Sequence, residues 1–193
     1  MKTKINYFLT IVISLTTHLI YSQQKLKIEN EIKSYTNSGY ILFLKKECDL
    51  NMDKKTDYIV ILKPNKNKIK KGENIINVCV FINNPDGFIL NECGGIIYPP
   101  NTNSLAEGFQ NLVVKNNYFT FEQQSASGQD FFENEDTTFK YDTTKKKIYL
   151  HKFSISRLHT NSKKDFTKIY SKKNFGDIEF FNFEMSELKD ILN

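Results

Sequence analysis

The sequence has no tryptophan and is poor in histidine and cysteine, with three of each among 193 residues. The absence of tryptophan disfavours a sugar-stacking platform. No His-x-x-x-His, Cys-x-x-Cys or glycine-rich phosphate loop occurs, which excludes the commonest zinc, redox and nucleotide motifs. His18 lies in the signal peptide expected at residues 1–22, so a hydrolase of the nucleophile–histidine–acid type would have to use His151 or His159. No apolar run reaches the roughly 20 residues that a transmembrane helix needs.

Residues 1–22 have the three parts of a secretory signal peptide. Lys2 and Lys4 provide a positive start, residues 8–15 form a short apolar core, and Ser22 places a small residue before the expected cut. The alternative is a buried N-terminal strand or helix. We therefore expect an exported protein, either periplasmic or extracellular.

The part that follows the expected cut, 23–193, is predicted to be a single β-rich domain whose last part, 165–193, is a C-terminal extension. Without Lys2 and Lys4 it has 25 basic and 22 acidic residues, a net charge of +3. This balance is too weak to indicate a nucleic-acid partner, and the lysine clusters predict solvated loops.

Short apolar runs separated by turn residues predict an α+β fold that is mainly β. The runs 57–63 and 75–82 are almost continuously apolar, so we expect central strands covered on both faces. We predict an antiparallel meander of about six to eight strands, with a short N-terminal helix at 25–33 and a C-terminal helix at 186–192 capped by Ser186. The other predicted strands are 40–44, 88–90, 118–121, 137–141, 148–153 and 166–170, and 94–108 is predicted to be a loop.

The loop before the predicted strand 57–63 has the clearest chemical pattern. Asp49, Asn51, Asp53 and Asp57 place side-chain oxygens at relative positions 1, 3, 5 and 9, a spacing that directs them to one centre. The main-chain carbonyl of Lys55 would add a fifth ligand. Calcium binds six to eight oxygens from carboxylates, amides, carbonyls and water. The sequence therefore predicts a structural calcium site that holds the start of the following strand.

Two features of this loop weaken the calcium interpretation. Position 6, where the chain turns through a left-handed conformation and glycine is usual, is Lys54, at a cost of about 1 kcal/mol. Position 12, a bidentate glutamate in EF-hands, is Val60, and the loop enters a strand instead of a helix. The alternative is a tight turn held by its own Asp and Asn side chains without an ion.

The residues around this loop resemble a group of uncharacterised exported bacterial proteins, which share Gly-Tyr, then Gly-Asp-Leu-Asn-x-Asp-Gly-x-x-Asp and a strand. The loop is also similar to the calcium loops of FG-GAP and integrin-type propeller repeats, in a single copy. The resemblance implies a secreted, sheet-containing domain with this calcium loop and carries no agreed activity. Cys48 and Lys54 stand where the group has glycine. The resemblance covers about residues 30–155. The segments that carry it are 39–58, 93–95, 117–124, 138–141 and 149–152.

The three cysteines cannot all pair within one chain, although an exported protein can keep disulfides. Cys79 and Cys93 lie on neighbouring predicted strands and are the first pair to test. A hairpin centred on residues 85–86 sets Cys79 opposite Glu92 instead, which argues against this pair. The connectivity among Cys48, Cys79 and Cys93 stays open.

Acidic residues gather in the predicted loop 122–136. A pair of carboxylates can hydrolyse a glycosidic bond, so a small exported hydrolase is one alternative function. His151 lies in an alternating strand, where a solvent-facing or packing role is favoured, and the serines of 125–128 lack the strand–turn–helix setting of a hydrolase nucleophile. The acids of this loop are Glu122, Asp130, Glu133, Glu135 and Asp136.

Aromatic residues are plentiful, with 16 Phe and 10 Tyr. Those at 131–132 and 180–183 have polar neighbours and, if exposed, would form contact patches, although completion of the core is the favoured interpretation. We expect a non-enzymatic exported protein that binds a protein or a glycan and carries a structural calcium loop. The alternatives are the small hydrolase and an envelope inhibitor or immunity-type protein.

Overall fold

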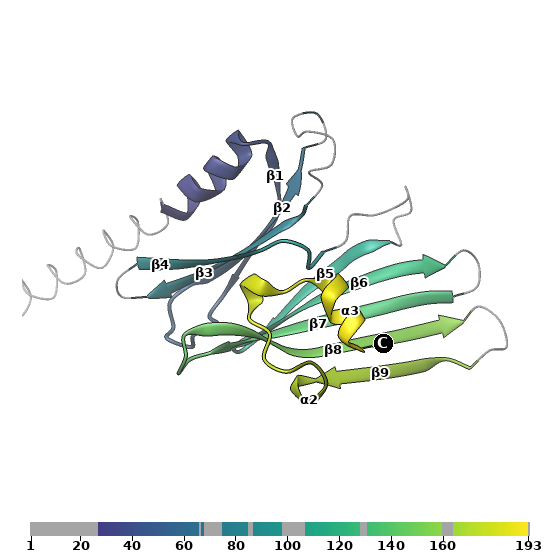
Figure 1. Cartoon of the computed structure of the whole chain (residues 1–193). Coiled ribbons are helices and arrows are strands. Elements are labelled where there is room, and N and C mark those ends of the chain that lie inside the picture. Colours follow the sequence, from purple (N-terminus) through teal and green to yellow (C-terminus); the bar gives the residue numbers. More distant parts are fainter. Residues whose placement is uncertain are drawn as a thin grey trace, which may run out of the picture.

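The computed structural model describes residues 27–65, 67, 75–84, 87–97, 107–127, 131–159 and 164–192. The signal peptide expected at 1–22 lies outside them. Within the described part of the chain, nine strands form two antiparallel sheets (Figure 1). The predicted mainly β, antiparallel fold with a helix near each end is confirmed, with the strands divided between two sheets.

Each sheet is a meander in which every strand pairs with the next one along the chain. The four-stranded sheet contains β1 (Tyr40–Cys48), β2 (Asp57–Pro64), β3 (Asn77–Asn84) and β4 (Gly87–Cys93). The five-stranded sheet contains β5 (Gly108–Lys115), β6 (Tyr118–Ser127), β7 (Phe131–Asp142), β8 (Lys147–His159) and β9 (Phe166–Ser171). After β9 the chain forms the short helix α2 (Lys172–Phe175), the 3-10 turn η1 (Phe180–Asn182) and the helix α3 (Met185–Leu192).

The central strands β2 and β3 are covered on both faces, as their continuous apolar sequences predict. A helix over residues 27–37 packs Ile28 and Ile32 against one face, where it meets Val60 and Phe81. The alternate residues of the same strands face the five-stranded sheet, because successive side chains of a strand point to opposite faces. Ile59 on β2, for example, is fully buried in the core between the two sheets.

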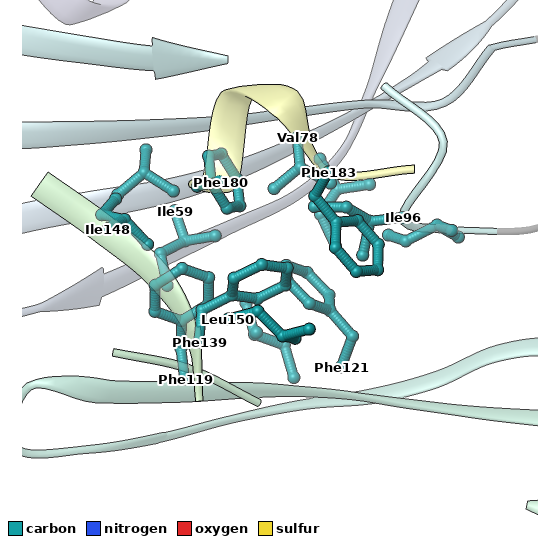
Figure 2. Close-up of a cluster of buried hydrophobic side chains, with 14 of the residues drawn as sticks. Ile59, Val78, Ile96, Phe119, Phe121, Phe139, Ile148, Leu150, Phe180 and Phe183 are labelled. Carbon is teal, nitrogen blue, oxygen red and sulfur yellow. The ribbon is translucent and has the colours of Figure 1, made fainter. Parts of the chain in front are cut away.

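Phenylalanine rings dominate the core between the sheets (Figure 2). The rings of Phe119 and Phe139 stack with centroids 5.5 Å apart. The η1 turn brings Phe180 onto Phe139 at 5.1 Å, and Phe183 onto the same ring at 5.2 Å. Phe180 and Phe183 are each 1% exposed, whereas Phe181 is 63% exposed. The core interpretation of this aromatic segment is therefore confirmed for Phe180 and Phe183, and Phe181 faces outward.

The prediction of a loop at 122–136 is wrong, because the described residues of this range belong to strands β6 and β7. β5 has no counterpart among the predicted strands. Its alternation is broken by a register shift between Phe109 and Asn111, and in β5 only Leu112 and Gly108 are buried. A strand with such weak apolar alternation gives little periodic signal.

The predicted cap of the C-terminal helix is also wrong. Leu188 N donates to the carbonyl of Glu184, so α3 begins before Ser186, which lies in its first turn. Met185, the first residue of α3, and Leu188, one turn later, are its buried residues.

Candidate functional sites

The loop between β1 and β2 is closed at its base by the pairing of Cys48 with Asp57. Within it, Met52 and Lys54 have positive φ angles of 59° and 66°. The left-handed turn expected at Lys54 is therefore present without the glycine that favours it. Hydrogen bonds from other residues of the loop hold this conformation.

Aspartate and asparagine side chains accept the backbone N–H groups of the loop itself. Asp49 Oδ1 accepts from Asp53 N at 3.0 Å, and its Oδ2 accepts from Lys54 N at 3.0 Å. Asn51 Oδ1 accepts from the same Asp53 N at 3.2 Å. Asp53 Oδ1 accepts from Lys55 N at 2.8 Å. These bonds are the Asx-type turns that stabilise a loop locally.

Asp57 has a different role, because its side chain points into the protein and is fully buried. Its Oδ2 accepts from Leu50 N at 2.6 Å and from Asn51 N at 3.3 Å. Its Oδ1 accepts from Asn83 N, on β3, at 2.8 Å. Burial raises the pKa of the Asp57 carboxyl, and the three N–H groups oppose that shift. Asp57 thus ties the loop to the end of β3.

The oxygen atoms of the loop are arranged only in part as ligands for a hard cation. The oxygens of Asp49 and Asn51 share one N–H donor, so two of the predicted ligands lie together. In contrast, both oxygens of Asp57 are occupied by buried N–H groups. Among the described residues, no group of three or more acidic, histidine or cysteine side chains is placed to hold a metal. A cation at this loop would need Asn51 and main-chain carbonyls besides carboxylates, and calcium there stays a prediction.

The acids predicted as a catalytic set lie on opposite faces of the five-stranded sheet, and Asp130 lies outside the described residues. Glu122 and Asp136 are paired across β6 and β7, and Asp136 accepts from Ser154 Oγ at 3.1 Å. Glu133 and Glu135 alternate with Asp136 along β7 and therefore point to the other face. Only Glu133 and Glu135 share a face that is partly covered by another element.

A cavity of about 220 Å³ lies between that face and the helix α3. The charged residues that line it are Glu133, Arg157 and Lys189. Arg157 binds Glu133 through Nε at 3.1 Å and Nη2 at 2.7 Å, and Lys189 of α3 pairs with Glu135, which lies behind the lining. The remaining lining is mainly apolar. The cavity is lined by Glu133, Phe153, Ile155, Arg157, Tyr170, Lys189 and Leu192.

Aromatic rings and burial hold these charges in place. The Arg157 guanidinium lies 4.2 Å from the centroid of Phe131 and 5.2 Å from that of Phe166. Glu135 is 4% exposed, and its second carboxylate oxygen is buried without a hydrogen-bond partner in the structure. A buried, half-satisfied carboxylate is costly, so the Lys189 pair is important to the fold of this region.

The sequence interpretation did not include Arg157 or Lys189. A signal existed in the alternation of Phe153, Ile155 and Arg157, which predicts that Arg157 points to the same face as two apolar residues. The contact of Lys189 with β7 has no such signal, because it joins residues 54 positions apart.

Cys79 and Cys93 do not pair, as the hairpin register at 85–86 indicated. The register of β3 and β4 sets Cys79 opposite Glu92 and Val78 opposite Cys93, and Cys79 is a free thiol. Cys48 is free as well. Burial, assisted for Cys48 by the neighbouring aspartates, raises the pKa of both thiols to about 12. These thiols are therefore protonated and poor nucleophiles at neutral pH.

His151 is exposed on β8, and its ring lies 4.9 Å from that of Tyr118. This placement agrees with the solvent-facing or packing role predicted for it. No helix in the described ranges is long and apolar enough to cross a membrane. Comparison of the chain with protein-family models, with curated proteins and with solved structures finds no match.

Proposed function

We propose that this chain is an exported, non-enzymatic binding protein and that the cavity beneath α3 is its contact site. The observation that supports this is the combination of three charged side chains, Glu133, Arg157 and Lys189, with apolar side chains around one partly open cavity. Such cavities, with a few placed polar groups among apolar side chains, are the usual form of binding sites.

The ion pairs favour binding over hydrolysis. A glycosidase of the carboxylate-pair type needs one carboxyl to donate a proton and the other to attack or to activate water. Here Glu133 is held by two N–H groups of Arg157, and Glu135 is buried against Lys189. Only Glu133 lines the cavity, and the charges of both carboxylates are already balanced by cations.

A protein partner is favoured over a glycan. Sugar binding on aromatic residues uses an open ring face. The rings of Phe131 and Phe166 lie against Arg157, and the two rings that line the cavity, Phe153 and Tyr170, stack on each other with centroids 6.1 Å apart. An arginine held between aromatic rings is instead typical of the residues that contribute most to protein–protein interfaces.

A pull-down from the cell envelope with the mature protein tests this proposal. Arg157→Gln should reduce recovery of the bound protein about tenfold or more, corresponding to roughly 1.4 kcal/mol or more of binding. Lys152→Gln, on the opposite face of β8, is the matched control and should leave recovery unchanged. Thermal melting of both variants checks that they fold.

Equal recovery with both variants would refute the cavity as contact site. Hydrolytic activity of the purified protein, lost in Glu133→Gln, would instead support the enzyme alternative. A single dominant partner from the same envelope would assign the chain to the inhibitor or immunity-type class within the proposed function.

We further propose that the loop binds calcium, with Asp49, Asn51, Asp53 and the carbonyl of Lys55 as ligands. Asp57 anchors the loop to the rest of the protein. The side-chain oxygens that accept the loop N–H groups keep a second lone pair for a cation. Bound calcium would add to stability by mass action, by about 2.7 kcal/mol at 100 times its dissociation constant.

Thermal melting in millimolar calcium and in EDTA tests the calcium proposal. Calcium should raise the melting temperature of the mature protein by several degrees, and Asp53→Ala should remove that gain. Asp142→Ala is the matched control, because Asp142 also caps an exposed turn, accepting from Thr144 N and Lys145 N. The proposal fails if calcium shifts neither the unmodified protein nor the control.

A further inference from the structure

The strand β9 forms one edge of the five-stranded sheet. It pairs with β8 on one side, from Lys152 opposite Ser171 to Arg157 opposite Phe166, without a register shift. No strand of the described residues pairs with its other side. Ile169 is 65% exposed on this strand, more than any other large hydrophobic side chain of the described chain. An edge of this kind presents unpaired N–H and C=O groups beside exposed apolar surface.

The edge strands β1 and β5 are less regular than β9. β1 and β5 each carry a register shift, and they meet through the rings of Phe43 and Phe109 at 5.8 Å. Register shifts of this kind disturb the ladder and discourage pairing with another chain. The remaining edge, β4, packs beside η1. The charge on β9, Lys168, lies 5.8 Å from the ring of Phe166 on the same strand.

The sequence of β9 is complementary to itself in one antiparallel register. If Ile169 lies on a two-fold axis, it faces Ile169 of a second copy, Lys168 faces Tyr170, and Thr167 faces Ser171. Apolar, cation–aromatic and hydroxyl pairs of this kind stabilise neighbouring strands. An axis at Lys168 would set two lysines directly opposite each other, which is unfavourable.

We infer that β9 pairs antiparallel with β9 of a second copy, with Ile169 on the two-fold axis, so that the two five-stranded sheets become one continuous sheet. The contact is isologous, as in most homodimers. Because it consists of one short strand from each copy, the interface lies at the small end of the range and the dimer should be weak. The inference does not depend on the cavity under α3 or on calcium.

Cysteine cross-linking tests both the dimer and its register. Directly opposite residues of antiparallel strands have Cα atoms about 4.5–5.5 Å apart, within the range for a disulfide. Ile169→Cys should therefore form a covalent dimer under mild oxidation. In Thr167→Cys the two new cysteines would be four residues out of register, roughly 13 Å apart, and should remain unlinked. The unmodified protein, with its own cysteines, is the background control.

Sedimentation of the unmodified protein provides the second measurement. Its weight-average mass should rise toward that of a dimer as concentration increases, and Ile169→Lys should abolish the rise. Ile169 is exposed, so this variant should keep the melting temperature of the parent. The inference is overturned if the parent stays monomeric at the highest concentration, or if both cysteine variants cross-link equally.

Discussion

Asp57 offers the sharpest test of how this fold is held together, because one buried carboxylate joins the loop to two strands. In Asp57→Ala, the N–H groups of Leu50 and Asn83 lose their acceptor in a buried environment. Each unsatisfied buried group costs about 1–3 kcal/mol. The weaker bond from Asn51, at 3.3 Å, is also lost.

Removal of a buried carboxylate offsets part of this loss, because its burial is itself unfavourable. Burial is the main cause of the raised pKa of Asp57, so removing the carboxyl removes an unfavourable contribution. We therefore expect Asp57→Ala to lower the free energy of unfolding by about 2–4 kcal/mol. For a domain of this size the melting temperature should fall by roughly 4–16 °C.

The assay is urea unfolding in EDTA, so that no metal contributes. Asp53→Ala is the control from the same loop, since Asp53 is exposed and accepts one N–H in the loop. It should cost about 0.5–1 kcal/mol. Equal effects of the two variants would refute the anchoring role of Asp57.

The pH dependence adds an independent check on the same residue. A carboxyl whose pKa is raised on folding binds its proton more tightly in the folded state, so its contribution to stability falls as pH rises above the ordinary value of 3.8. The cost of Asp57→Ala should therefore be larger near pH 4 than at pH 7. A larger cost at pH 7 would mean that the three N–H groups outweigh burial.

Three further predictions concern the core, the thiols and a histidine. Phe180→Ala should cost about 3–5 kcal/mol in urea unfolding because the ring is buried against other phenylalanines, whereas Phe181→Ala should cost less than about 0.5 kcal/mol. Cys48 and Cys79 should react with a thiol reagent at pH 8 far more slowly in the native protein than in denaturant, because each has a pKa of about 12; rapid native reaction at either would contradict this. His151 should titrate below 6.5 by NMR, because partial desolvation of its ring and two nearby lysines lower its pKa, so the stability contributed by its neutral form is lost as pH falls below 6.5.

Much of the four-stranded sheet could be predicted because its signals are local. The apolar runs of β2 and β3 predicted central strands covered on both faces, and the turn around 85–86 predicted that Cys79 faces Glu92. Position 6 of the first loop predicted a left-handed residue, which Lys54 adopts. Periodicity and turn chemistry act over a few residues, so they can be recognised without knowledge of the rest of the fold.

The five-stranded sheet was harder to predict because its strands are less regular. β5 lacks a clean alternation, and the predicted loop 122–136 consists of strand in its described residues. The acids there alternate along β7, so pairing with β6 and β8 sends Glu133 and Asp136 to opposite faces. The closeness of these acids in sequence suggested a single acidic cluster, but in the structure they divide into two groups on opposite faces of the sheet.

The sequence by itself determined the fold class, the buried central strands and the left-handed turn at Lys54, since each depends on neighbours a few residues apart. Only the tertiary structure decided that Asp57 reaches Asn83, that Lys189 covers Glu135, and that β9 is left as a regular edge. These contacts join residues far apart in the chain. Strand register and the packing of the C-terminal segment bring them together, and neither leaves a periodic trace in the sequence.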